Sequence, residues 1–230
     1  MHLHEEILLL ALKDETGKID WKAGMYQFVM AGAIISELLI DNYLEVSDKK
    51  KKLLTAVNTT THDNPLINEA LEKIRSSKKP KNIQHWIMSL GNMKGLKEKT
   101  ARHLCRQGIL KEEESKVLFF FTTKKYPQIN SSPERQLIER LNKAIFREDE
   151  IDIRTCLLIS LTWKSGILAI PFSRKALKQK NARLKEIVNG ELVGEATEQA
   201  IQAVQAAIAV IAIMPAITAS PGAGASSGGC

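Results

Sequence analysis

The sequence has little cysteine, few aromatic side chains and no apolar run long enough to cross a membrane. Its three cysteines are Cys105, Cys156 and Cys230, and no two of them have the spacing of a metal site or a redox pair. This excludes a disulfide-bonded secreted scaffold and favours a reducing compartment. A chain of 230 residues with 44% apolar and 26% charged residues can bury a sizeable core, which predicts an ordinary soluble globular protein.

Signals for export and for membrane insertion are also absent. The chain begins with the acids Glu5 and Glu6 instead of a basic segment, which argues against a secretory signal. The longest apolar stretch, around Ala206–Met214, is about a dozen residues, short of the roughly 20 needed to span a bilayer. We therefore expect a cytoplasmic protein. Residues 219–230 are rich in Gly, Ser and Ala and predict a flexible tail, which leaves 1–218 as one domain.

The residue patterns of common enzymes are missing as well. There is no glycine-rich phosphate loop, nucleophile elbow or zinc spacing. His2 and His4 are a possible metal pair, but they lie at a terminus that we expect to be mobile. His62, within Thr61–Asp63, is better explained as part of the loop before a helix than as a catalytic base. The sequence thus predicts a protein that is not an enzyme, with no metal and no cofactor.

Helical periodicity runs through most of the chain and predicts a mainly α fold, a single-domain bundle of amphipathic and buried helices with one β-hairpin. The hairpin is expected to have Ile109-Leu110 as its first strand, Lys111–Lys116 as a polar turn and Val117–Phe121 as an unusually apolar second strand. A short extended piece is expected at Tyr43–Val46. Helices are expected at about 3–12, 23–39, 65–74, 83–91, 96–107, 133–146, 152–161 and 174–188, and from about 195.

Positive charge is concentrated in one part of the chain. The segment Ser47–Arg106 has 14 Lys or Arg against 5 Asp or Glu, or +9, whereas the whole chain has +7, so the rest sums to about −2. A local excess indicates a particular anionic partner. Lys94, Lys97 and Lys99 lie at the start of the helix expected at 96–107, where free backbone N–H groups and the helix dipole favour an anion. The alternative is a merely solvated helix start.

Two anionic partners fit this charge. One is an acidic membrane surface, where the indole of Trp21 can lie at the interface and each nearby lysine contributes about 1 kcal/mol. For Trp21 the alternative is a partly buried core position. The other partner is nucleic acid, because a basic helix followed by a hairpin looks like the recognition helix and wing of a winged-helix protein. Base-reading Asn, Gln and Arg are sparse on that helix, so the membrane is favoured.

Five segments resemble, in order and spacing, those of one known family, the Golgi phosphoprotein 3 family of phosphatidylinositol-4-phosphate effectors. Together they extend over roughly Leu3 to Phe146. They are the opening Leu3–Gly17, the second-helix segment Gly32–Leu38, the segments Leu66–Leu71 and Ile83–Ile87, and the helix-to-hairpin junction Arg102–Leu110.

The resemblance implies a binding site for a lipid head group. In the family, a tryptophan near the first helix–helix turn, an arginine one helix later and two arginines in the loop before the hairpin helix hold that group. Trp21 matches the tryptophan, Lys94 and Lys97 match the loop arginines, and Met30 takes the place of the other arginine. Lysine lacks the bidentate fork of arginine, and methionine offers nothing to a phosphate. We therefore expect a basic pocket of Trp21, Lys94, Lys97 and Lys99 that binds anionic, phosphatidylinositol-4-phosphate-like head groups.

The resemblance also implies self-association through the hairpin, at Leu118, Phe119, Phe120 and Phe121. The alternative is that these side chains only cover the protein's own helices. Oligomers would multiply weak lipid contacts at a membrane surface, of Golgi type in a eukaryote. Because the chain begins almost at the first family helix, we expect a short form like those of bacteria, without the basic N-terminal extension with which eukaryotic members engage vesicle coats.

Overall fold

The computed structural model describes residues 1–192 except 49, 118–120, 148 and 150. Within these residues the fold is mainly α, as predicted. No helix in this part of the chain is long and apolar enough to cross a membrane. The helix expected from about residue 195 and the tail at 219–230 lie outside the described residues, as does the proposed domain boundary at 218.

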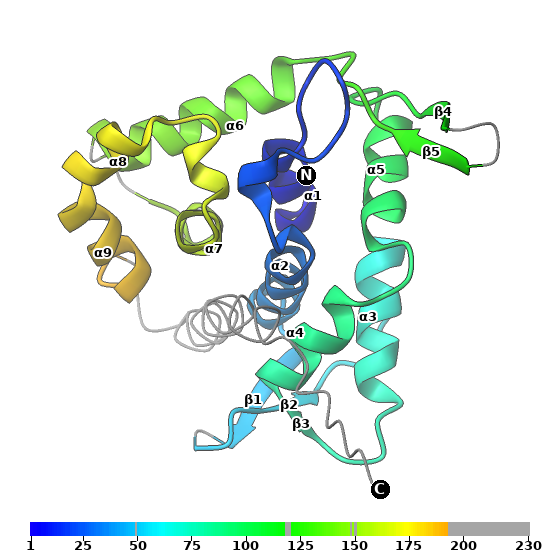
Figure 1. The fold of residues 1–230 in the computed structure, drawn as a ribbon. Helices are drawn as coiled ribbons and strands as arrows, with labels where there is room; N and C mark the ends of the chain where they lie inside the picture. Colours follow the sequence, from blue (N-terminus) through cyan, green and yellow to red (C-terminus); the bar gives the residue numbers. More distant parts are fainter. Residues whose placement is uncertain (49, 118–120, 148, 150, 193–230) are drawn as a thin grey trace, which may run out of the picture.

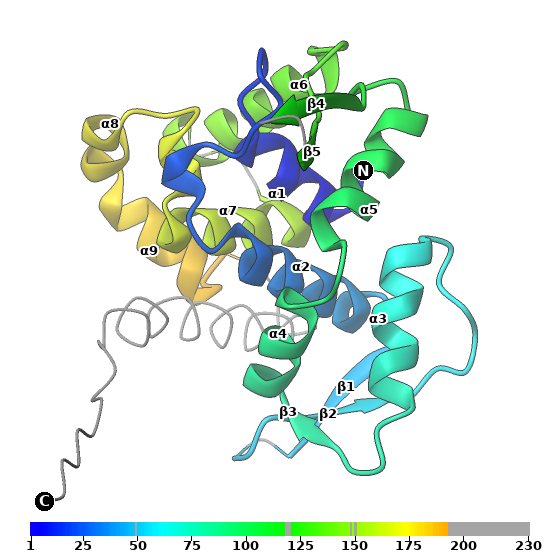
Figure 2. The ribbon, with the colours of Figure 1, turned by 45° about the vertical axis from the view of Figure 1, so that its right-hand side comes forward.

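Two buried helices form the centre of the molecule, α1 (Leu3–Ala11) and α2 (Tyr26–Ile40). Every residue of α1 is buried, and α2 is buried from Phe28 to Leu39. A helix that is apolar nearly all round needs cover on all sides. Figures 1 and 2 show how it is provided: α3 to α5 lie on one side of this central pair and α6 to α9 on the other.

The first group of covering helices is α3 (Pro65–Arg75), α4 (Ile83–Gly91) and α5 (Leu96–Arg106). The Asn64 side chain accepts hydrogen bonds from the N–H groups at the start of α3 (3.0 and 3.2 Å), and Asn82 caps α4 in the same way (2.8 Å). Gly108, at φ +71°, follows the end of α5, as expected of a C-terminal glycine. These local signals explain why all three helices begin and end close to their predicted limits.

The second group begins with α6 (Ser132–Asn142), which continues into a π-helical turn, η2 (Lys143–Arg147). It is followed by α7 (Ile153–Ser165), capped by Asp152, and by the 3-10 turn η3 (Ile167–Ala169). The single helix expected at 174–188 is instead two helices, because the backbone leaves helical dihedrals at Lys180, with φ −100° and ψ 21°. The two helices are α8 (Arg174–Gln179) and α9 (Asn181–Asn189).

A small antiparallel sheet, β1-β2-β3, lies beside α3 and α4 (Figure 1). Its strands are β1 (Leu44–Asp48), β2 (Leu53–Ala56) and β3 (Lys81–Asn82). The β1–β2 hairpin is additional to the predicted one. Its turn contains the run of lysines, and Lys52 adopts a left-handed backbone with φ +50°. Because the lysines of this turn interrupt the apolar pattern, the sequence analysis did not predict strand β2. Leu44 on β1 and Leu54 on β2 are nevertheless buried.

The predicted hairpin is present, but its strands are β4 (Glu113–Val117) and β5 (Phe121–Lys125). Val117 and Phe121 are paired across the hairpin, so the continuous strand expected at Val117–Phe121 is wrong. Glu113 and Glu114 lie opposite Lys125 and Lys124, and such opposite charges stabilise a two-stranded ribbon without an apolar strand. Leu118, Phe119 and Phe120 lie outside the described residues, and only the backbone of Phe121 is described, so self-association through them stays a prediction.

Candidate functional site

Trp21 projects into solvent from a backbone that is held in place. Its side chain lies on η1 (Trp21–Ala23), and the residue is 74% exposed, so it is not a core tryptophan. The Asp20 carboxylate accepts a hydrogen bond from the N–H of Lys22 (2.8 Å). The Lys22 ammonium in turn donates to the carbonyl of Ala169 in η3 (3.2 Å). An exposed indole on an anchored turn is unusual, because large apolar side chains normally gain from burial.

A second tryptophan, which the sequence analysis did not single out, lies on the helix next to this turn. Gly166, at the end of α7, is so close to η1 that a Cβ there would be 3.4 Å from the carbonyl oxygen of Lys22. Trp163, one turn earlier, is partly exposed, and the ammonium of Lys164 lies 4.1 Å from its ring centroid. The sequence contained one sign of this, because a tryptophan followed by a lysine ends a helix that is otherwise apolar. The region where η1 lies beside η3 and the end of α7 therefore contains two indoles, of Trp21 and Trp163, and two ammonium groups, of Lys22 and Lys164.

The three candidate lysines do not converge on one point. Lys94 is exposed in the α4–α5 loop and has no ion pair within the described structure. The Lys97 ammonium lies 3.2 Å from the Glu98 carboxylate. The Lys99 ammonium donates to both oxygens of Glu69 (2.7 and 2.6 Å). Two residues along a helix correspond to about 200° of rotation, so Lys97 and Lys99 lie on different faces of α5.

The first turn of α5 lacks a side-chain cap. The residue before it, Gly95, has φ +75° and no side chain that could accept a hydrogen bond from the N–H groups of that turn, although its carbonyl accepts one from Lys99 (2.8 Å). N–H groups without a side-chain cap, together with Lys94 and Lys97, would favour an anion, and binding there stays a prediction. Glu98, in the same turn, offsets part of that charge.

The start of α2, a few residues after Trp21, lies against the α4–α5 junction. A Cβ on Gly91, the last residue of α4, would be 2.3 Å from the Phe28 ring. Burial raises the pKa of Tyr26, and the nearby carboxylate of Glu98 raises it further. One part of the molecule therefore includes both the segment after Trp21 and the loop of Lys94. Met30, where the family has an arginine, is fully buried and cannot contact a head group.

The predicted recognition helix and wing are arranged unfavourably for nucleic acid. The guanidinium of Arg102 on α5 donates to Glu112 (3.2 Å), and Lys124 on β5 also pairs with Glu112. Glu113 and Glu114 on β4 are exposed. Glu113 pairs with Lys111 (3.5 Å) and Glu114 with Lys124 (3.6 Å), so the base of the hairpin carries charges of both signs instead of a continuous positive face for a phosphate backbone.

The N-terminal histidines are part of the folded core. The Leu3 N–H donates to the Glu37 carboxylate (3.1 Å), and His2 Nδ1 lies 2.9 Å from the same carboxylate. The expectation of a mobile terminus is wrong because a buried acid on α2 anchors it. The N–H of Asn64 donates to His62 Nδ1 (3.0 Å), so His62 belongs to the loop before α3, as predicted. The described residues contain no group of three or more His, Cys, Asp or Glu side chains able to hold a metal.

Comparison with known proteins agrees with the predicted resemblance. The chain is 24% identical over 158 residues to the vacuolar protein sorting-associated protein 74 of Eremothecium gossypii, a match that covers 60% of this chain and 47% of that relative. The chain thus spans about half the length of this curated relative. The model of one family, Golgi phosphoprotein 3 (GPP34), matches residues 3–204, nearly all of the part that the structure describes. The chain therefore belongs to the Golgi phosphoprotein 3 family.

Proposed function

We propose that this protein is a non-catalytic peripheral membrane protein that binds anionic phospholipid head groups, of the phosphatidylinositol-4-phosphate type, through Trp21, Lys94 and Lys97. Family membership gives the prior expectation. The observation that carries the proposal is the 74% exposure of Trp21 on an anchored turn, close in sequence to the segment that packs against the α4–α5 junction. An indole at the level of the head groups keeps its N–H in water while its ring contacts acyl chains.

The expected attachment is weak and reversible. Each lysine near an acidic surface contributes about 1 kcal/mol, and this contribution falls as salt increases. Lys94 and Lys97 act as point charges, and Met30, which the resemblance matches to an arginine, is fully buried. We therefore expect a broad preference for acidic lipids with a modest advantage for phosphomonoester head groups, which carry more charge. Lys99, engaged by Glu69, adds only to the general positive potential.

The names of the family and of the relative connect them with the Golgi and with vacuolar sorting. We extend this to the present chain only as a proposal that its target is an internal or acidic membrane. Self-association through the hairpin, at Leu118–Phe121, would add avidity to these contacts.

Vesicle flotation tests the proposed site. Vesicles containing 5% phosphatidylinositol-4-phosphate or 20% phosphatidylserine are compared with neutral vesicles. We expect wild-type protein to float with the acidic vesicles, and Lys94→Ala/Lys97→Ala and Trp21→Ala each to lose most of this binding. The matched control, Arg135→Ala/Lys143→Ala, removes two exposed charges, one on α6 and one at the start of η2, and should float normally. Equal losses in the control and in the lysine variant would reject a specific site.

The alternative, a winged-helix-like nucleic-acid-binding protein, is tested on the same samples. A gel shift with mixed-sequence duplex DNA at the same salt should show much weaker binding than flotation does, because glutamates at the base of the hairpin interrupt the positive charge beside α5. Tight duplex binding that Lys94→Ala/Lys97→Ala abolishes would favour the alternative.

A further inference from the structure

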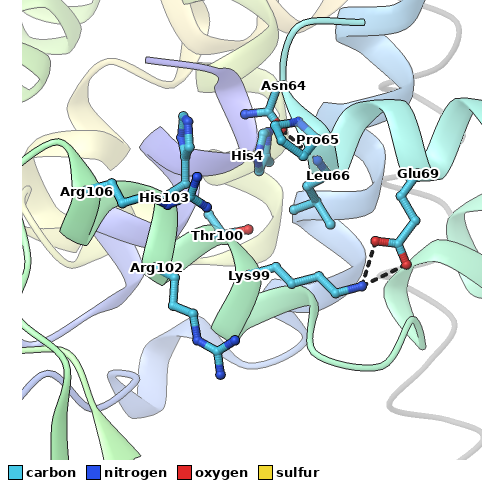
Figure 3. Close-up of a pocket in the computed structure, with 10 residues that line it drawn as sticks. All are labelled: His4, Asn64, Pro65, Leu66, Glu69, Lys99, Thr100, Arg102, His103 and Arg106. Carbon is cyan, nitrogen blue, oxygen red and sulfur yellow. Dashed lines mark hydrogen bonds and ion pairs between the residues drawn. The ribbon is translucent and has the colours of Figure 1, made fainter. Parts of the chain in front are cut away.

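A pocket of about 240 Å³ lies between α1, α3 and α5, away from the proposed lipid site. Figure 3 shows its lining: α5 contributes Lys99, Arg102 and Arg106, the start of α3 contributes Glu69, and α1 contributes His4. This face of α5 is turned away from Lys97. The pocket is therefore a separate site, and of its lining only Lys99 also contributes to the proposed lipid binding, through the general positive potential.

The lining has an excess of positive charge. Three cations, Lys99, Arg102 and Arg106, face one carboxylate, Glu69, so the excess is +2 before any histidine is protonated. Lys99 is held by Glu69, and Arg102 by Glu112, so their positions are fixed. The side chain of Arg106 is exposed and makes no hydrogen bond or ion pair with another described residue.

His4 forms the buried wall of this pocket and lacks a hydrogen-bond partner. It is fully buried, and neither ring nitrogen is bonded. Its Nδ1 lies 3.9 Å from the Glu37 carboxylate, too far for a hydrogen bond. A buried polar group without a partner costs about 1–3 kcal/mol, so a ligand atom that bonds to His4 would gain from its presence.

The uncharged polar groups of the lining are already engaged within the protein. The Thr100 hydroxyl donates to the Leu96 carbonyl (2.9 Å), and Asn64 Oδ1 already accepts from the start of α3. The nearby buried acid, Glu5, does not line the pocket, and its carboxylate is occupied by His103 and by the N–H of His2 (2.8 Å). Guanidinium, ammonium and imidazole groups remain, and they suit a compact ligand rich in acceptors and negative charge.

We propose that this pocket binds a phosphate monoester, with the phosphate between Arg106, Lys99 and His4. Its volume is below the range of about 300–1,000 Å³ for drug-sized ligands, so it fits a phosphate with a small substituent. The monoester can come from a soluble metabolite or from a lipid head group such as that of phosphatidic acid. This inference goes beyond the proposed function and does not depend on it.

Isothermal titration with inorganic phosphate and with glycerol 3-phosphate, at constant ionic strength, tests the proposal. We expect saturable one-site binding to wild-type protein and at least a fivefold weaker affinity for Arg106→Ala. The control Arg135→Ala, an equally exposed arginine on α6, should bind as wild type does. Lys94→Ala/Lys97→Ala should also bind normally, which separates this pocket from the lipid site. Because Arg106 has no partner, its removal should leave the fold intact, and circular dichroism checks this.

Nuclear magnetic resonance of the imidazole nitrogens in wild-type protein provides a readout that needs no variant. Phosphate should shift the signals of His4 and His103 but not those of His85, which is exposed on α4 and outside the pocket. The Lys94→Ala/Lys97→Ala variant, which lacks the proposed lipid site, separates the two sources. If this variant floats with phosphatidic-acid vesicles and saturating glycerol 3-phosphate releases it, the monoester is of lipid origin, and if the variant does not float, the monoester is a soluble one. Absence of saturable binding, equal effects of Arg106→Ala and Arg135→Ala, or unmoved His4 signals would each overturn the proposal.

Discussion

The buried carboxylate of Glu37 holds three parts of the core together through charged hydrogen bonds. It is fully buried on α2, where it accepts hydrogen bonds from Arg154 (2.5 Å) and from His2 (2.9 Å). Burial alone would raise the pKa of Glu37, but His2 and Arg154 hold it well below its ordinary value. The carboxylate is therefore charged in the folded protein and joins α1, α2 and α7.

Glu37→Gln should destabilise the protein by about 3–5 kcal/mol, because it leaves Arg154 partly buried without a counter-charge. Urea denaturation at pH 7 measures this. Glu139→Gln, on the exposed face of α6 where Glu139 pairs with Arg147 (3.3 Å), should cost less than about 1 kcal/mol. Similar losses in both variants would contradict a special role for Glu37.

Glu134 makes stability depend on pH. Burial raises its pKa from 4.5 to about 7, although a hydrogen bond from Gln128 (2.6 Å) opposes the shift. The folded state therefore holds this proton more tightly than the unfolded state does. The resulting stabilisation is fully present below pH 4.5 and is lost as the pH rises through about 7.

We expect the free energy of unfolding to be about 2 kcal/mol lower at pH 8 than at pH 5, after allowing for partial solvent screening of Glu134. Glu134→Gln should remove most of this difference. A smaller slope should remain, because the hydrogen bond to Glu37 raises the pKa of His2, and its stabilisation is also lost as pH rises. Urea melts at both pH values measure the difference, and an unchanged difference in Glu134→Gln would show that Glu134 is not responsible.

At the scale of elements, the contact between α2 and α4 depends on a glycine. Gly91 lies against the Phe28 ring, with no room for a methyl group. Gly91→Ala should destabilise the protein by about 1–3 kcal/mol, because the ring or the helix must move. Gly24 has an extended backbone and no atom within 4 Å of a Cβ position, so Gly24→Ala should change stability by less than about 0.5 kcal/mol. Thermal melts compare the two, and equal effects would show that the α2–α4 contact is looser than described.

At the scale of the whole molecule, attachment to membranes should depend strongly on salt. The proposed contacts are exposed charges, and the Debye length falls from about 8 Å at 0.15 M to about 3 Å at 1 M. We expect flotation with acidic vesicles to fall several-fold between 0.05 and 0.5 M NaCl. Binding that persists at 0.5 M would indicate that apolar insertion, rather than charge, dominates.

Self-association is a second property of the whole molecule. If the hairpin residues Leu118–Phe121 join copies, replacing all four with serine should shift the mass measured by light scattering to that of a monomer. It should also weaken flotation, because avidity is lost. Monomeric wild-type protein at the same concentration would reject this role.

Most of the helices could be predicted from the residues alone, because caps, glycines and apolar periodicity act over a few residues. Asn64, Asp152 and Gly108 mark helix ends that the structure reproduces. The family could also be predicted, because its short segments occur in the same order in this chain although the identity to the relative is only 24%. The strands of the hairpin could not be, since the ribbon is paired through Glu and Lys and has no apolar alternation to read.

Which charges lie close together, in contrast, depends on how the helices pack. Neighbours in sequence such as Lys97 and Lys99 are separated by the turn of the helix, whereas Lys99 and Glu69 are brought together by the packing of α5 against α3. The exposure of Trp21, the burial of His4 and the pairing of Glu37 with Arg154 likewise depend on residues far apart in the chain. Local sequence fixes backbone conformation through short-range forces, but burial and electrostatic partnership are properties of the assembled core.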